Sequence, residues 1–222
     1  MTRRRDQRRG SRAEQPLGVR RTDDGRGWSF AVEEIICNGP HRIFVIDRDA
    51  TEPGTGDDAV LVAQSLGAFT APLVAAQSPL AELVFVNAMI PRPGERPGEW
   101  WGNTRSEQAR RAAAERGGYS PDFDLETYFL HDVPPDVAAA GAPYQREEAD
   151  AAFGSVCGFE AWPAIPIRSV AGVADRFFPV DFQRELAHAR LGIEADVLPG
   201  GHLVALSQPE ALTSYLLTRP AT

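Results

Sequence analysis

The stretch AQSLG, residues 63–67, constrains the fold more than any other part of this chain. It follows an apolar run at 59–62 and precedes small residues with helical character at 68–76. This pattern predicts a strand, a sharp turn and a helix with Ser65 at the apex, the arrangement called a nucleophile elbow. Such a turn strains the serine backbone and needs small residues two positions before and after it. Ala63 and Gly67 meet that need.

A serine at such a turn lies beside the first backbone amides of the following helix. The amide of Leu66 is the first of these, which makes it a candidate donor to an oxyanion. The alternative is a serine in an ordinary strand-to-helix turn, because small-x-Ser-x-Gly patterns often arise by chance. The rest of the chain bears on this choice.

Asp175 and His202 each follow a predicted strand. Asp175 comes just after the apolar stretch 164–171, and His202 follows the short strand 195–198 within the sequence LPGGHL. The order Ser, Asp, His, with each residue near the carboxyl end of a strand, is that of the α/β-hydrolases and differs from other serine-triad folds. The structural alternatives are a helix-start cap ahead of Pro179 for Asp175 and a polar turn residue for His202.

Four ordered stretches carry a family resemblance: VLVAQSLGAF at 60–69, LVFVNAMIP at 83–91, DRFFP at 175–179 and GGHL at 200–203. On these stretches, residues 57–218 resemble the carboxyl-terminal two-thirds of an α/β-hydrolase. The chain is most similar to small, lid-bearing esterases related to plant methylesterases. The resemblance implies Ser65 as nucleophile, His202 as general base and Asp175 as the group that orients the imidazole, with Asp181 as the fallback acid.

The hydrophobic pattern predicts one α/β domain at residues 28–222, with a mostly parallel central sheet flanked by helices. Strands and helices alternate from residue 59 onward, which favours parallel pairing. Strands are expected at 30–37, 43–47, 59–62, 83–86, 164–171 and 195–198, and helices at 66–76, 179–191 and 208–217.

The pattern changes at about residues 92–160 to loops rich in proline and glycine with short helical pieces at 106–116, 124–129, 135–140 and 146–152. The resemblance implies a helical lid here that covers the nucleophile. Within it, His131 and Asp132 are interpreted as a pair that stabilises its loop. Candidates for a substrate-binding wall are Met89, Trp100, Trp101, Phe123, Tyr128 and Phe129, although plain packing is the alternative for each.

The amino-terminal part is too short for a complete fold of this kind. The strands at 30–37 and 43–47 are joined by only five residues, which is hairpin length, and 48–58 leave little room for a helix. The missing strand normally supplies a second oxyanion donor, whose loss costs around 3–4 kcal/mol of transition-state stabilisation. Candidate substitutes are the amides of Asn38 and Gly39 or of the loop after Asp47. The strand at 59–62 is left with an unusual partner or a bare edge, which dimerisation would relieve.

Charge is unevenly distributed. Residues 1–27 contain nine arginines and four acidic residues, whereas 28–222 contain 14 arginines and 27 acidic residues. We expect residues 1–27 to be a disordered arginine-rich tail. The acidic body disfavours a nucleic-acid partner, and no apolar run of about 18 residues indicates a membrane span. Two cysteines without a disulfide pattern indicate a cytoplasmic protein, and no spacing typical of metal or cofactor sites is present.

The sequence thus predicts a serine hydrolase that cleaves a small-molecule carboxylic ester through an acyl-enzyme on Ser65. Two alternatives stay open. One is a hydroxynitrile-lyase-like reaction on the same three residues, because the family resembled includes such enzymes. The other is a weak or inactive hydrolase scaffold that binds a small apolar ligand, which the short amino-terminal part favours.

Overall fold

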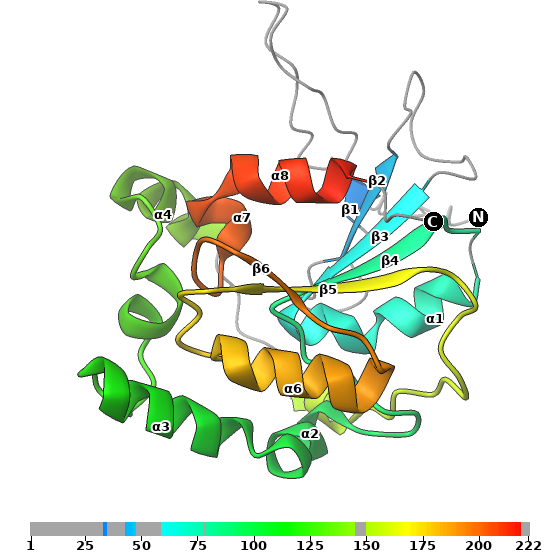
Figure 1. The fold of residues 1–222 in the computed structure, drawn as a ribbon, viewed down its shortest axis with the longest axis horizontal. Coiled ribbons are helices and arrows are strands. Elements are labelled where there is room, and N and C mark those ends of the chain that lie inside the picture. The colour runs from blue at the N-terminus through cyan, green and yellow to red at the C-terminus, as the bar shows by residue number, and fades with distance from the viewer. Residues whose placement is uncertain (1–32, 35–42, 48–58, 78, 145–149, 219–222) are drawn as a thin grey trace, which may run out of the picture.

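A computed structural model describes residues 33–34, 43–47, 59–77, 79–144 and 150–218, and within them it contains one six-stranded sheet (Figure 1). The strands lie side by side in chain order: β1 (Glu33–Glu34), β2 (Ile43–Asp47), β3 (Ala59–Gln64), β4 (Glu82–Val86), β5 (Ile167–Gly172) and β6 (Asp196–Leu198). The strands β3 to β6 are parallel to one another, which confirms the predicted α/β class with a mostly parallel sheet.

The first two strands form an antiparallel extension of this sheet. β1 pairs antiparallel with β2, which the short stretch before Ile43 predicts, and β2 pairs antiparallel with β3. Ile43 is paired with Ala63, and Asp47 is paired with Ala59. β2 is therefore the unusual partner of β3, and it enters the sheet at the end of β3 that leads to Ser65. The predicted tail at 1–27 lies outside the described residues.

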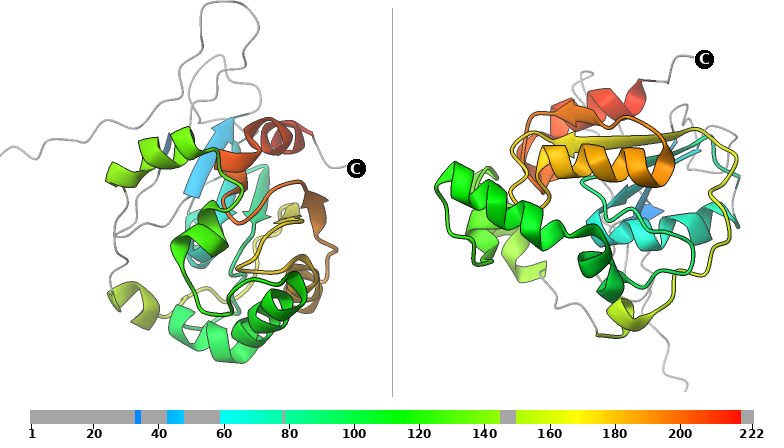
Figure 2. Two further views of the ribbon diagram at one scale, coloured as in Figure 1. Left: turned by 90° about the vertical axis from the view of Figure 1, so that its left-hand side faces the viewer. Right: turned by 60° about the horizontal axis from the view of Figure 1, so that its bottom comes forward.

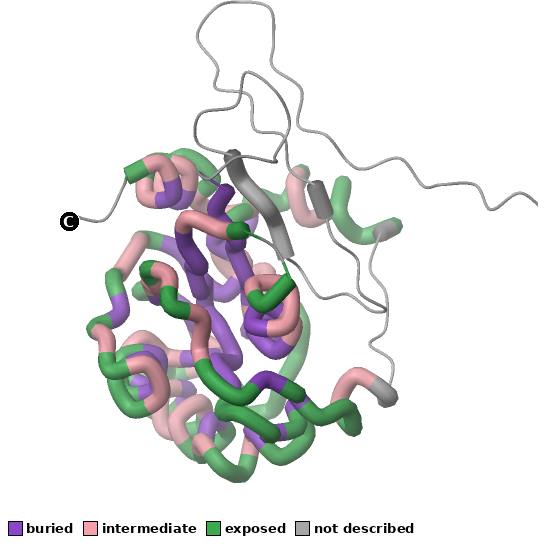
Figure 3. Tube along the Cα trace, turned by 90° about the vertical axis from the view of Figure 1, so that its right-hand side faces the viewer, coloured by how far each residue is buried: buried purple, intermediate pink, exposed green. Residues whose placement is uncertain are grey.

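Alternation along β3 and β4 divides the core into two layers. Every residue of these two strands is buried, as the tube in Figure 3 shows. One face packs against α1 (Ala71–Ala75) and α6 (Val180–Leu191), and the other packs against α8 (Pro209–Leu217). The first face carries Leu61, Ala63, Leu83 and Phe85, and the second carries Val60, Val62, Val84 and Val86. Helices thus cover both faces of the parallel part (Figure 1).

The predicted helix at 66–76 is two shorter pieces, the 3₁₀ helix η1 (Ser65–Phe69) and α1. Pro72 explains the break, because it has no amide hydrogen to donate to residue 68 in a continuous α-helix. Three helices of the described residues were not predicted: α2 (Pro97–Thr104), whose interior contains Gly98 and Gly102, the short 3₁₀ helix η3 (Ala142–Tyr144) and the short α7 (Val204–Ser207). β5 begins at Ile167, later than predicted, directly after Pro166.

The residues between β4 and β5 form a helical layer, which we call the β4–β5 insertion (residues 87–166). Its helices are α2, α3 (Ser106–Gly117), the π-helical turn η2 (Glu126–Leu130), α4 (Pro135–Gly141), η3 (Ala142–Tyr144) and α5 (Asp150–Gly154). Helices α3 and α4 lie on the left in Figure 1, at the end of the sheet that β5 reaches, and Figure 2 shows the layer from two further sides. No helix in the described part of the chain is both long and apolar enough to cross a membrane.

A buried ion pair joins the start of this insertion to α6. Arg190 Nη2 donates to Glu95 Oε1 at 3.0 Å, and the two side chains are only 2% and 4% exposed. Arg190 Nη1 also donates to the Ile90 carbonyl at 2.7 Å, and Asn103 Nδ2 donates to Glu95 Oε1 at 2.8 Å. Although burial by itself raises the pKa of Glu95, the hydrogen bonds from Arg190 and Asn103 hold it below its ordinary value. The ion pair and its hydrogen bonds therefore anchor the start of the insertion to α6.

Candidate active site

Ser65 lies at the turn between β3 and η1. Its φ of 49° falls in the left-handed region that side chains other than glycine rarely adopt. Ala63 and Gly67 on either side are buried, and the Ser65 carbonyl accepts a hydrogen bond from the Met89 amide at 3.0 Å. This is the strained strand–turn–helix geometry that the sequence predicts, because the two small residues let β3 and η1 approach closely.

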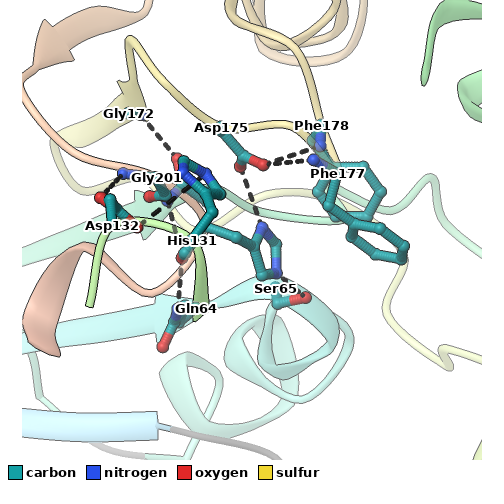
Figure 4. A network of polar contacts seen from close by, with 11 residues as sticks. Gln64, Ser65, His131, Asp132, Gly172, Asp175, Phe177, Phe178 and Gly201 are labelled. Atoms are coloured by element: carbon teal, nitrogen blue, oxygen red, sulfur yellow. Dashed lines mark hydrogen bonds and ion pairs between the residues drawn. The ribbon is translucent and has the colours of Figure 1, made fainter. Parts of the chain in front are cut away.

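The three residues singled out by their order meet at this turn. His202 Nε2 lies 3.1 Å from Ser65 Oγ, and His202 Nδ1 lies 2.9 Å from Asp175 Oδ2 (Figure 4). The imidazole is 1% exposed and Asp175 is 5% exposed, whereas Ser65 is only partly buried. The structure thus forms a continuous hydrogen-bonded chain from a carboxylate in the core to a partly exposed hydroxyl. Asp181, the fallback acid, is an exposed residue in the first turn of α6.

Asp175 uses its two carboxylate oxygens for different partners. Oδ1 accepts hydrogen bonds from the backbone amides of Phe177 at 2.8 Å and Phe178 at 2.9 Å (Figure 4). Oδ2 remains for His202. The alternative of a helix-start cap does not hold, because α6 begins at Val180 without a side-chain cap and the two amides bound by Asp175 precede that helix. The two amide contacts fix the orientation of the carboxylate.

Two side-chain amides hold the backbone of the His202 loop. Gln64 Nε2 donates to the His202 carbonyl at 2.8 Å, and Asn87 Nδ2 donates to the carbonyls of Gly201 at 3.0 Å and His202 at 2.9 Å. Asn87 has a φ of 45°, and its Oδ1 accepts from the Gly172 amide at 2.7 Å. The sequence pattern assigned neither side chain a role. Their positions at and just after the ends of adjacent strands are the signal that was available.

Aromatic rings enclose the imidazole of His202. Phe129 from η2 stacks on it at a centroid distance of 4.6 Å and an interplanar angle of 18°. Phe177 and Phe178 approach with T-shaped geometry, each at 5.2 Å. These rings exclude water from the imidazole, and low local polarity strengthens its hydrogen bonds to Asp175 and Ser65.

Leu66 occupies the first turn of η1, where backbone amides have no acceptor within the helix. Its amide is therefore available beside the Ser65 hydroxyl. Both predicted sources for a second amide, Asn38 and Gly39 and the loop after Asp47, lie outside the described residues.

The predicted substrate-wall residues divide into two groups. Met89, Trp100 and Tyr128 are buried; Trp100 Nε1 donates to the Ile90 carbonyl at 3.0 Å, and the Tyr128 hydroxyl donates to the Ser120 carbonyl at 2.6 Å. Packing and internal hydrogen bonds account for these three. The other three have different surroundings: Phe129 covers His202, and Trp101 and Phe123 line a pocket.

This pocket has a volume of about 250 Å³ and lies under α3, with lining residues Trp101, Ser106, Glu107, Arg110, Phe123 and Phe177. Ser65 does not line it. Phe177 belongs to both places, because it lines the pocket and also contacts the His202 ring. The Phe177 ring therefore lies between this pocket and the imidazole of His202.

The other potentially reactive side chains are either buried in the core or exposed on the surface of a helix. Burial raises the pKa of Cys157 to about 12, and its Sγ contacts the Phe69 carbonyl at 3.0 Å. His188 is exposed on α6. Within the described ranges, no group of three or more histidine, cysteine or acidic side chains is placed to hold a metal ion.

With this fold and geometry established, comparison with known proteins gives the family. The sequence matches the model of the alpha/beta hydrolase family over residues 10–214, so the chain belongs to the α/β-hydrolases. No curated protein matches it closely enough in sequence to count as a relative.

Several solved structures of esterases and of a hydrolase are similar to this one. Polyneuridine aldehyde esterase is 16% identical with a TM-score of 0.55, over 77% of this chain and 74% of that protein. A methylesterase from Arabidopsis is 17% identical with a TM-score of 0.53, over 75% and 70%. A pyrethroid hydrolase from Sphingobium faniae JZ-2 is 20% identical with a TM-score of 0.51, over 71% and 68%. At such identities the likeness establishes the shared fold.

Proposed function

We propose that this α/β-hydrolase is a serine esterase that cleaves small carboxylic esters through an acyl-enzyme on Ser65. The observation that carries the proposal is the unbroken chain Asp175–His202–Ser65, with contacts of 2.9 and 3.1 Å, at a strained turn after a buried strand. A serine hydroxyl is a poor nucleophile at neutral pH unless a neighbouring base accepts its proton. His202 is in position to do so.

The steps follow from which atoms face one another. His202 Nε2 takes the Ser65 proton as Oγ attacks the ester carbonyl, while Asp175 Oδ2 accepts a hydrogen bond from Nδ1–H and stabilises the imidazolium without taking its proton. The Leu66 amide donates to the resulting oxyanion. The intermediate then expels the alcohol, which receives its proton from His202, and water hydrolyses the acyl-enzyme by the same sequence of transfers.

The neighbouring pocket favours an uncharged apolar group on the substrate. Both charged side chains in its lining already have partners: Glu107 pairs with Arg111 at 3.0 Å, and Arg110 donates to the Pro121 carbonyl at 2.9 Å. The guanidinium of Arg110 also lies over the Tyr128 ring. Trp101, Phe123 and Phe177 provide most of the remaining surface. We infer that an aromatic or branched apolar alcohol or acyl group binds there.

Covalent labelling tests the proposal. A fluorophosphonate is expected to modify Ser65 in the folded protein, to be located by peptide mass spectrometry, and Ser65→Ala should abolish both labelling and the turnover of p-nitrophenyl acetate. Ser155→Ala is the matched control and should label normally. Folded protein that takes up no label, or Ser65→Ala protein that turns over the ester at the original rate, contradicts the proposal. Ligand binding without turnover would then favour the inactive scaffold.

A further inference from the structure

Asp132 makes a hydrogen bond to the loop that carries His202. This contact is separate from the hydrogen bonds that join Asp175, His202 and Ser65. It lies in the turn between η2 and α4, in the β4–β5 insertion. Its Oδ2 accepts a hydrogen bond from the backbone amide of Gly201 at 2.5 Å (Figure 4). Gly201 directly precedes His202. A carboxylate from the insertion is therefore bonded to the peptide group one residue before the imidazole.

The identity of residue 201 makes this contact possible. A Cβ atom at Gly201 would lie 2.6 Å from Asp132 Oδ1 and 2.9 Å from His131 Nε2. Real Cβ atoms do not come that close to such atoms, so any other residue would push the loop and the carboxylate apart. Glycine is required here for close approach, because the loop must reach the insertion while the imidazole still reaches Ser65.

The opposite side of the same loop is also held. Asn87 binds the carbonyls of Gly201 and His202, and Gln64 binds that of His202. These two amides come from the ends of β3 and β4. The sheet thus holds the loop through these two amides, and the insertion holds it through Asp132. The backbone at His202 is fixed between the two sets of contacts.

Stabilisation of the fold does not by itself explain why the Asp132 carboxylate lies at this position. Asp132 Oδ1 and His131 Nε2 are both buried without a hydrogen-bond partner among the described residues, and they are 3.9 Å apart. Burial, assisted by the Arg176 charge, lowers the pKa of His131 and so favours the neutral imidazole, which offers Asp132 no opposite charge. A partly buried carboxylate with one buried, unsatisfied oxygen is destabilising, and we infer that it serves the position of the loop.

We propose that Asp132 is a positioning residue for His202: by holding the Gly201 amide it sets the approach of His202 Nε2 to Ser65 Oγ. The β4–β5 insertion is thereby coupled to the reactivity of the serine. This inference rests on the proposed function of Ser65 as a nucleophile. Asp132 acts through Gly201 and not through a contact with Asp175, His202 or Ser65. We therefore expect its replacement to change the rate of the chemical step and not the affinity for substrate.

Phosphonylation kinetics of Ser65 test this coupling, with ester turnover measured in parallel. We expect Asp132→Ala to lower both the labelling rate constant and kcat by about 10- to 100-fold, with KM within about twofold of its original value. Asp132→Asn keeps an acceptor oxygen for the Gly201 amide and should recover most of the rate. Asp136→Ala, which removes an exposed acid on the neighbouring α4, is the matched control and should change neither rate.

A second variant covers the case in which Asp132→Ala does not fold. Gly201→Ala keeps the Asp132 side chain, but the added Cβ atom forces the carboxylate away from the loop. This variant should show the same loss of labelling. In both variants the proton resonance of His202 Nδ1–H, observed by NMR, should shift as the imidazole moves relative to Asp175.

The outcomes separate the inference from the function on which it depends. Folded Asp132→Ala or Gly201→Ala protein that labels at the original rate overturns the positioning role and leaves the esterase proposal intact. Original protein that does not label at Ser65 overturns both. A loss confined to KM, with the labelling rate unchanged, also overturns the positioning role, because a contact on substrate would then explain it.

Discussion

Asn87 Nδ2 lies 2.9 Å from the backbone carbonyl of His202 and donates a hydrogen bond to it, although 115 positions separate the two residues in the chain. The same amide group also binds the Gly201 carbonyl and accepts from the Gly172 amide. One buried side chain therefore joins the ends of β4 and β5 to the loop that carries the imidazole. Its backbone is left-handed, a conformation that asparagine tolerates better than most residues.

We predict that Asn87→Gly reduces both stability and the rate of Ser65 labelling. Glycine accepts the left-handed backbone, so the variant removes the three hydrogen bonds without adding strain. Buried groups left unsatisfied cost about 1–3 kcal/mol each, and urea unfolding should show a loss of at least that size. Asn87→Ala should be less stable still, because alanine adds left-handed strain of about 1–2 kcal/mol.

Asn103 provides the control for Asn87. Its amide donates to Glu95, at the base of the insertion. Asn103→Ala should lower stability but leave the labelling rate of the folded protein unchanged. Equal labelling of Asn87→Gly and the original protein would show that the amide does not govern the His202 position.

Asp175→Asn should lower kcat for ester hydrolysis by about 10⁴-fold while the fold is retained. The asparagine oxygen can keep the two backbone amides of Phe177 and Phe178, which turns its NH₂ group toward His202 Nδ1. The imidazole must then accept at Nδ1 and carry its proton on Nε2, facing Ser65. That tautomer cannot act as the base.

Steady-state kinetics of Asp175→Asn and Asp181→Asn, side by side, check this assignment. Asp181 is exposed, and its replacement should leave kcat unchanged. The opposite ranking of the two variants would transfer the orienting role to Asp181.

Breaking the Glu95–Arg190 pair should strongly destabilise the protein. Arg190→Met leaves a buried carboxylate without its main partner, and we expect a loss of about 3–5 kcal/mol in the free energy of unfolding. The double variant Arg190→Met with Glu95→Leu should recover part of that loss, since no unpaired charge remains. Urea denaturation of both variants measures the difference, and a double variant less stable than the single one would contradict the expectation.

Stability should fall on the acid side of neutrality because of His131. Burial, with a contribution from the Arg176 charge, lowers its folded pKa below the ordinary value of 6.5, against the opposing charges of Asp132 and Asp175. The unfolded chain therefore binds this proton more readily than the folded chain. The contribution of neutral His131 to the free energy of unfolding is complete above the ordinary pKa. It is lost as the pH falls through the lower pKa of the folded state.

Urea unfolding at about pH 7.5 and 5.5 tests this dependence. His131→Asn should lose less stability between the two conditions than the original protein. His188→Asn, at an exposed position, should behave like the original. No difference between His131→Asn and the original would mean that His131 titrates alike in both states.

The pocket beside Phe177 predicts a selective effect on substrates. Trp101→Ala removes one of its aromatic walls and should raise KM for esters with a phenyl or branched apolar group, with little change for p-nitrophenyl acetate. Loss of a large apolar contact corresponds to about 1–3 kcal/mol, or roughly 10- to 200-fold. An equal effect on all esters would place the apolar group of the substrate elsewhere.

Local pattern predicted much of the fold. The apolar runs that predict strands at 59–62 and 83–86, and the helix predicted at 179–191, correspond to β3, β4 and α6 with small differences at their ends. Such features depend on neighbours within a few positions, which a sequence displays directly. The predicted helix at 66–76 was wrong in detail, because Pro72 divides it, and α2 was missed because its two glycines hide the helical pattern.

By itself, the sequence determined the elbow at Ser65 and the order in which Asp175 and His202 follow it. Only the tertiary structure decided that β2 runs antiparallel beside β3, that three phenylalanines enclose the imidazole, and that Asn87, Gln64 and Asp132 hold the loop before it. The elbow depends on small residues adjacent in the chain. The other contacts join residues up to 138 positions apart, and their geometry exists only once the sheet and the insertion have packed together.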